Sequence, residues 1–122
     1  MVSGPGLGLT LALASALVAT PAAGRPAEQV ISGFGEVRGF TLLLFDSDSA
    51  RQAGDLDQCW SVAIPPNLES KLAKLTGEPL RLVVRQAQVQ FDPPDSRIIF
   101  RGRQVDNWCG RTPLFEAVRL AK

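Results

Sequence analysis

Residues 33–45, which read GFGEVRGFTLLLF, carry the strongest indication of the fold class. Gly33, Gly35 and Gly39 interrupt an apolar pattern, and glycine within a strand pattern is typical of a bulge or a sharp bend. The run Phe40–Phe45 is almost continuously apolar, which indicates a strand that is buried on both faces or lies in a barrel wall. We therefore predict two bent strands here, joined closely in sequence.

The remaining chain continues the β pattern and adds one helix. Leucines at positions 68, 72 and 75 form an apolar stripe at helical spacing, with Asn67 as N-cap and Gly77 at the end. Near Arg85 and Gln86 the apolar residues of a strand change phase, which implies a bulge or bend. The elements expected after residue 45 are a loop over Asp46–Gln58, a strand over Cys59–Ile64, a helix over Leu68–Thr76, a strand over Leu80–Phe91, its hairpin partner over Arg97–Val105, and a strand or short helix over Leu114–Leu120.

This order of elements resembles the OB-fold, a five-stranded Greek-key barrel with a helix between its third and fourth strands. The matching stretches are residues 35–46 (GEVRGFTLLLFD), 59–64 (CWSVAI), 67–77 (NLESKLAKLTG), 80–92 (LRLVVRQAQVQFD) and 97–105 (RIIFRGRQV). The resemblance implies a mainly β, small OB-like barrel of the order β-β-β-α-β-β, of the kind found in exported bacterial proteins. Leu114–Leu120 would be an extra C-terminal element. The alternative fold is an α+β meander with one helix.

The composition excludes several classes of function. The 122 residues include 13 Lys and Arg, 12 Asp and Glu, and neither His nor Tyr. Without His there is no Ser-His-Asp triad, no Cys-His pair and no His metal site. A net charge of +1 gives no general attraction to nucleic acid. We expect a protein that is not an enzyme, uses no cofactor and does not bind nucleic acid. A small hydrolase that uses paired carboxylates is the enzymatic alternative.

Residues 1–24 are typical of a secretory signal peptide, because they contain no charged side chain and include the apolar run Leu7–Ala19. This run is shorter than the roughly 20 residues of a membrane span. Small residues follow it and allow cleavage after Ala22 or after Gly24. We expect export to the periplasm or the exterior, no membrane span in the mature chain, and a single domain over residues 25–122.

The chain contains two cysteines, Cys59 and Cys109. An even number of cysteines in a small exported domain indicates a disulfide bond. Neither cysteine belongs to a Cys-x-x-Cys motif, so we do not expect a redox or nucleophilic role.

Two groups of residues are candidates for ligand binding. Arg97, Arg101 and Arg103 have the same parity along one expected strand, and guanidinium groups bind phosphates and carboxylates. Trp60 and Trp108 each adjoin a cysteine, so a disulfide would bring both indoles to one end of the barrel. The alternative is that the arginines form a plain solvated face and that the tryptophans are packing residues. We expect no metal site among the aspartates of the polar loop, which are Asp46, Asp48, Asp55 and Asp57.

The sequence thus predicts an exported, non-catalytic binding module. It does not identify the ligand, and an anionic chain on the arginine-bearing strand is the candidate. The resemblance implies that a barrel face and its flanking loops would take the ligand. The alternative from another class is a cell-envelope structural or stress protein that acts through a protein partner.

Overall fold

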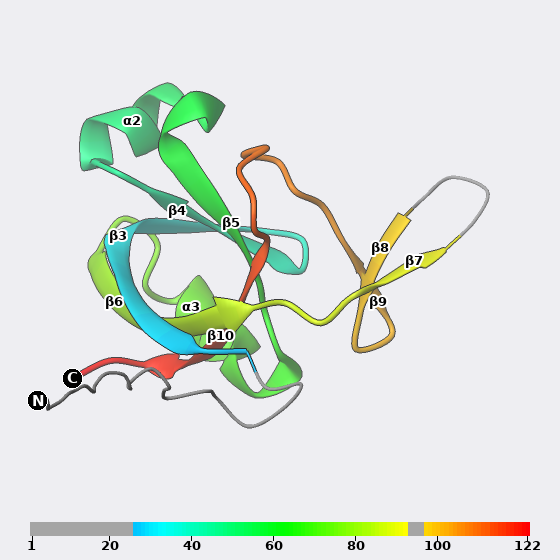
Figure 1. Ribbon diagram of the computed structural model, residues 1–122. Helices are drawn as coiled ribbons and strands as arrows, with labels where there is room; N and C mark the ends of the chain where they lie inside the picture. The colour runs from blue at the N-terminus through cyan, green and yellow to red at the C-terminus, as the bar shows by residue number, and fades with distance from the viewer. Residues whose placement is uncertain (1–25, 93–96) are drawn as a thin grey trace, which may run out of the picture.

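The computed structural model describes residues 26–92 and 97–122 (Figure 1). The expected signal peptide, residues 1–24, lies outside this range. The elements in chain order are β3 (Glu28–Arg38), β4 (Thr41–Phe45), α2 (Asp48–Ala53), η1 (Leu56–Gln58), β5 (Cys59–Ala63), η2 (Pro66–Leu68), α3 (Glu69–Ala73), β6 (Pro79–Gln86), β7 (Gln90–Asp92), β8 (Arg97–Phe100), β9 (Arg103–Val105) and β10 (Phe115–Leu120). None of the helices in the described ranges has the length and apolar character needed to span a membrane.

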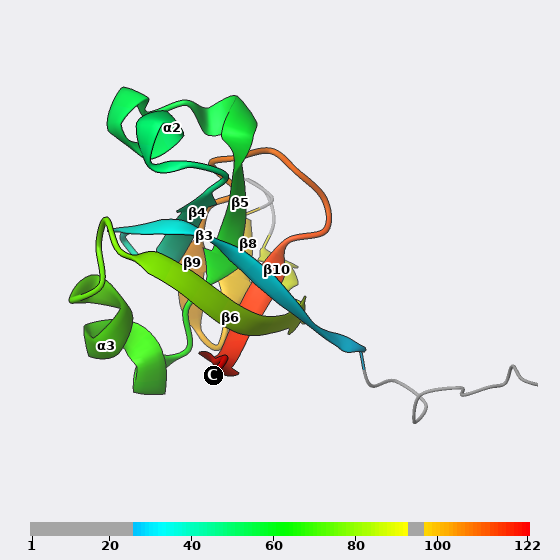
Figure 2. The same cartoon turned by 90° about the vertical axis from the view of Figure 1, so that its left-hand side faces the viewer.

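Five strands close into a barrel in the order β10-β5-β4-β3-β6 (Figures 1 and 2). Strand β3 pairs antiparallel with both β4 and β6, and β4 pairs antiparallel with β5. Strand β10 completes the ring, because it runs antiparallel to β6 and parallel to β5. The predicted mainly β class and five-stranded barrel are therefore confirmed, and the sheet closes instead of forming the alternative open meander.

The fifth barrel strand is not the one expected from the sequence. The predicted fifth strand, Arg97–Val105, belongs to a separate three-stranded sheet of order β7-β8-β9. The predicted extra element, Leu114–Leu120, supplies β10 instead. The phase change near Arg85 and Gln86 has a different cause from a bulge: β6 ends at Gln86, and the chain leaves the barrel there. The hairpin between the two runs is confirmed, since β7 pairs antiparallel with β8.

The barrel interior is filled by alternate residues of the strands. Leu42 and Leu44 of β4 point inward, and α3 closes one end of the barrel with Leu72. Gly33 allows β3 to cross close to β4, since a Cβ atom at this position would lie 2.4 Å from the carbonyl oxygen of Phe45. The requirement for glycine here explains the interrupted pattern in the sequence.

Strand β4 is buried on both faces, as predicted for the run Phe40–Phe45, although Phe40 itself lies in the turn before the strand and is exposed. Leu43 and Phe45 point away from the interior and pack in a second cluster, together with Ala50 of α2. The segment Asp46–Gln58, expected as a loop, contains α2 and η1. Helix α2 forms because Ser47 caps it, accepting a hydrogen bond from the amide of Ala50 at 3.1 Å.

The helix predicted over Leu68–Thr76 is present but shorter and divided. It begins as η2 and continues as α3, which ends at Ala73. Leu68 and Leu72 are buried, as the apolar stripe predicted. Gly77 has a φ of +82°, which favours glycine, but α3 already ends at Ala73, so Gly77 lies in the turn that follows and does not end the helix as predicted.

The disulfide between Cys59 and Cys109 is confirmed, with an S–S distance of 2.03 Å and a Cα–Cα distance of 5.5 Å. It fastens the connection between β9 and β10 to the start of β5. Both cysteines belong to the same buried cluster as Leu43 and Phe45. The bond therefore holds this connection over the outer side of the barrel.

Candidate functional site

The three predicted arginines do not lie along one strand. Strands β8 and β9 form a hairpin in which Phe100 pairs with Arg103, and Arg101 and Gly102 make the turn. Their φ angles are +51° and +80°, as a two-residue turn of type I′ requires. The expected alternate spacing of Arg97, Arg101 and Arg103 is therefore wrong, because the chain reverses between the second and third residues.

Each of these arginines has its own surroundings. The guanidinium of Arg103 turns toward the barrel, where it pairs with Glu69, donates to the carbonyl oxygen of Ile64 at 2.9 Å and lies 4.2 Å from the ring centre of Phe40. The guanidinium of Arg101 lies 3.7 Å from the carboxylate of Glu116. Arg97 is exposed at the start of β8.

The two tryptophans also have separate partners. The half-buried ring of Trp60 packs against Phe115 with a centroid distance of 5.1 Å, and the guanidinium of Arg111 lies 5.0 Å from its ring centre. Trp108 is 43% exposed, with the guanidinium of Arg38 5.1 Å from its ring centre. Trp60 is thus a packing residue at the barrel wall, whereas Trp108 contributes to the surface.

The outer face of β4 and β5 is covered by the chain itself. Outward-facing Leu43, Ser61 and Ala63 are at most 1% exposed. The connection after β9 lies over them: the amide of Asp106 donates to the hydroxyl of Thr41, and the amide of Cys109 donates to that of Ser61. Phe100 and Val105 pack on Ala63 beside this connection. A ligand cannot reach this barrel face, although the resemblance implied that a barrel face would bind it.

The aspartates of the polar segment serve the local structure. Asp48 accepts hydrogen bonds from Arg51 and Gln52, and these bonds lower the pKa of its carboxyl group. Asp55 caps η1, and the carboxylate of Asp46 lies 3.1 Å from the guanidinium of Arg111. Within residues 26–92 and 97–122, no three acidic or cysteine side chains lie close enough together to hold a metal ion.

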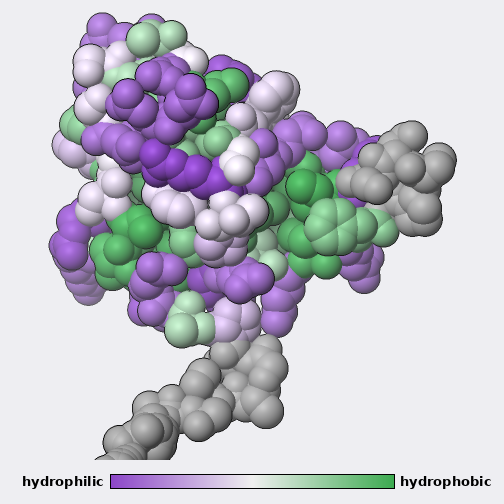
Figure 3. Space-filling model, turned by 45° about the horizontal axis from the view of Figure 1, so that its top comes forward, coloured by the Kyte–Doolittle hydropathy of each residue, from purple (hydrophilic) through white to green (hydrophobic). Residues whose placement is uncertain are grey.

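A cavity of about 660 Å³ lies where the three-stranded sheet leaves the barrel. Its walls come from the end of β6, the segment that follows it, the sheet and the connection before β10. The lining residues are Gln86, Ala87, Val89, Phe91, Ile98, Asn107, Thr112, Pro113 and Leu114. Phe91 is 64% exposed, and apolar side chains gather over this sheet beside the grey atoms in Figure 3. No charged side chain occurs among the described residues that line the cavity.

Hydrogen bonds of the backbone and of the Asn107 side chain fix the walls of this cavity. The amide of Ala87 donates to the carbonyl oxygen of Leu114 at 2.8 Å, which ties the two sides together. Asn107 holds the opposite wall, because its side chain donates to the carbonyl oxygen of Arg111 and accepts from the amide of Gly110. The cavity is therefore a fixed feature of the junction, with Gln86, Asn107 and Thr112 as polar residues in an otherwise apolar lining.

Glu116 is a buried carboxylate that the sequence analysis did not single out. It is 2% exposed and lies on β10 opposite Arg85 of β6. One of its oxygens lies 3.1 Å from the guanidinium of Arg85, and the other accepts a hydrogen bond from the amide of Gln88 at 3.1 Å. With the ion pair to Arg101, this one side chain connects β10, β6, the cavity wall and the β8–β9 turn.

Comparisons with protein-family models, with curated proteins and with solved structures give no match to this chain.

Proposed function

We propose that this chain is an exported, non-catalytic binding module with an OB-fold, and that its ligand is a small, uncharged and mainly apolar molecule held in the cavity beside Phe91. The alternative is a protein partner that contacts the same exposed ring. The arginines expected along one strand do not lie in a row there, because Arg101 is in the turn that reverses the chain before Arg103.

The strand order supports the OB-fold. The first four barrel strands lie in the order β6-β3-β4-β5, so the fourth strand returns beside the first as in a Greek key. The helix α3 lies between the third and fourth strands in sequence, as in OB-folds. The three-stranded sheet is then an insertion between the fourth and fifth strands.

The cavity is the observation that carries the choice of ligand. Its volume of about 660 Å³ falls within the range of small-molecule sites, which are mostly apolar with a few polar groups. Phe91 and Ile98 supply the apolar wall from paired positions of β7 and β8. Phe91 is largely exposed to water, and a ligand that covers its ring is stabilised by the removal of this apolar surface from water.

A neutral fluorescent probe tests this site. The dye N-phenyl-1-naphthylamine brightens in apolar surroundings, and we expect a saturable increase in its fluorescence with the intact protein. Phe91→Glu places a charge at the apolar wall and should weaken dye binding about tenfold or more, the effect of losing one apolar contact. Because Phe91 is exposed, this variant should still fold.

Val30→Glu is the matched control, since Val30 is also exposed and lies outside the cavity lining. It introduces the same charge and should bind the dye as the parent protein does. Equal weakening by both variants would contradict the cavity as the site. Absence of saturable binding by the parent protein would favour the protein-partner alternative.

Export is tested on the native protein. The N-terminal residue of protein purified from its source should be Ala23 or Arg25, as cleavage after Ala22 or Gly24 requires. Intact Met1 in a cytosolic fraction would overturn the assignment of residues 1–24.

A further inference from the structure

A second surface of the barrel gathers arginines from three separate segments. On β6, Leu82 and Val84 point into the barrel, so the residues between and beside them face outward. Strand register places Val30 of β3 and Arg119 of β10 on either side of Val83. We call this surface the arginine face; its cations are Arg81, Arg85, Arg101 and Arg119, and its carboxylates are Glu28 and Glu116.

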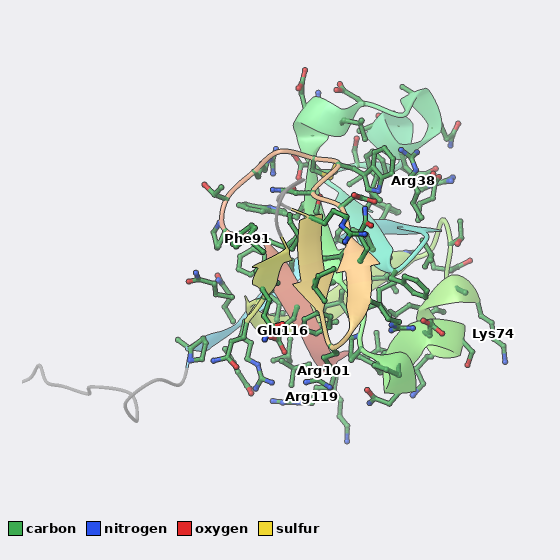
Figure 4. All side chains as sticks on the ribbon, turned by 90° about the vertical axis from the view of Figure 1, so that its right-hand side faces the viewer. Arg38, Lys74, Phe91, Arg101, Glu116 and Arg119 are labelled. Atoms are coloured by element: carbon green, nitrogen blue, oxygen red, sulfur yellow. A yellow bond between two sulfur atoms is a disulfide. The ribbon has the colours of Figure 1, made fainter. Side chains whose placement is uncertain are left out.

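The carboxylates of the arginine face do not neutralise it. Four cationic and two anionic side chains give a formal charge of +2, whereas the whole chain carries +1, so the remainder of the chain is net negative. Figure 4 shows Arg101, Glu116 and Arg119 gathered at one end of the three-stranded sheet, away from Phe91. Positive charge is therefore concentrated on one side of the barrel, and an anion is attracted to that side.

Three of the four guanidinium groups make contacts within the protein that a ligand could replace. Arg81 donates to the main-chain oxygen of Lys122 at 2.6 Å. Arg119 pairs with Glu28 at 3.3 Å, but both side chains are well exposed, and such pairs contribute little free energy. Arg101 lies 3.7 Å from a carboxylate that Arg85 already binds closely. Arg81, Arg101 and Arg119 can therefore bind a ligand with little loss of free energy from their present contacts.

The shape and chemistry of the arginine face select the kind of anion. Arg81 lies four residues, or about 13 Å, along β6 from Arg85. Arg101 shares the carboxylate of Glu116 with Arg85. Arg81 and Arg101 are therefore too far apart for a single carboxylate or phosphate, and their separation suits a chain. Between Arg81 and Arg85 lie Val83 and the exposed Val30, and no aromatic residue is among the described residues that pair across this face. Nucleic acid binding generally uses aromatic rings on which bases stack. The apolar faces of sugar rings can instead lie on valine.

We propose that the arginine face binds an acidic polysaccharide, with its carboxylates on Arg81, Arg101 and Arg119 and a sugar ring over Val30. This surface is separate from the Phe91 cavity, so the proposal does not depend on the cavity binding a ligand. It also differs from the anion site expected from the sequence, because only Arg101 belongs to both.

The test measures binding of fluorescently labelled oligogalacturonate at low salt. The parent protein should bind it, and affinity should fall steeply as salt is added, because exposed charge contacts are screened. The double variant Arg81→Gln/Arg119→Gln should bind about tenfold more weakly, the effect expected of two surface charge contacts. The charge-preserving variant Arg81→Lys/Arg119→Lys should retain most of the affinity.

Lys71→Gln/Lys74→Gln is the matched control, since it removes the same two charges from exposed positions near α3. It should bind as the parent protein does. An equal loss of affinity in this control would show that binding depends on net charge alone, and it would overturn the proposal. Failure of the parent protein to bind the oligogalacturonate would also overturn it. Tighter binding of oligothymidine or of phosphatidylglycerol vesicles would overturn the choice of polysaccharide. Thermal unfolding of each variant shows that a loss of binding is not a loss of fold.

Discussion

Replacing Cys59 and Cys109 together with alanine is expected to lower the free energy of unfolding by about 4 kcal/mol. The bond joins residues 50 apart in sequence, and a loop of this size restricts the unfolded chain by roughly this amount. The stabilisation is large relative to the total for a small domain, which is typically about 5–15 kcal/mol. Denaturant unfolding of the double variant, followed by fluorescence of the two tryptophans, gives the measurement.

The same bond also decides whether the outer face of β4 stays covered. Without it, residues 106–110 are held there by two hydrogen bonds, from the amides of Asp106 and Cys109 to hydroxyl groups, and by the contact of Trp108 with Arg38. The next residue, Arg111, keeps its ion pair with Asp46. Hydrogen bonds of this kind contribute about 1 kcal/mol each. Hydrogen exchange should therefore rise first at residues 106–110 in the variant. If the free energy of unfolding falls by less than about 1 kcal/mol, or if hydrogen exchange at residues 106–110 does not change, the role given to the disulfide is contradicted.

The elements that the sequence predicted best are those whose pattern is local. Leu42, Leu43, Leu44 and Phe45 are apolar residues at successive positions, and a strand with both faces buried is the structure that places all four out of water. Leu68 and Leu72 have the spacing of one helical face, and both are buried in the barrel. The disulfide followed from the number of cysteines and the expected compartment.

The error at the arginines arose because parity along a strand holds only while the strand continues. Arg101 and Gly102 form a type I′ turn, for which the typical sequence is asparagine followed by glycine. A left-handed conformation is costly for arginine. Its side chain gains contacts in return, since the guanidinium lies 5.2 Å from the ring centre of Phe100 and pairs with Glu116. The contact with Phe100 is between neighbouring residues, but the pairing with Glu116 is long-range and leaves no local pattern.

The cavity could not be predicted for a similar reason. Its walls come from residues 86–91, from Ile98 and from residues 107–114, which are brought together by the insertion of a sheet between two barrel strands. The sequence pattern that relates to the cavity is the alternation of apolar residues at Val89 and Phe91 after the phase change. That alternation was consistent with an ordinary barrel strand. The departure of the chain from the barrel at Gln86 depends on the pairing of β6 with β10, which the sequence assigned to another segment.

Glu116 is the other residue whose role depends on distant partners. Its neighbours Phe115 and Ala117 face the barrel interior, so alternation alone places Glu116 on the outside. It is nevertheless buried, because Arg85, Arg101 and the backbone of Gln88 surround its carboxylate. A carboxylate without these partners would be costly to bury. The inserted sheet is thus attached to the barrel by a charged contact as well as by apolar packing.

Glu116→Ala is accordingly expected to lower the free energy of unfolding by about 2–3 kcal/mol. Loss of one partner from a fully buried pair costs about 3–5 kcal/mol, but the side chain of Arg85 is 29% exposed and can regain part of its hydration. The amide of Gln88 also loses its acceptor. Glu28→Ala is the matched control, because its pair with Arg119 is exposed, and it should change stability by less than about 1 kcal/mol. Similar values for the two variants would show that Glu116 contributes no more than a surface charge.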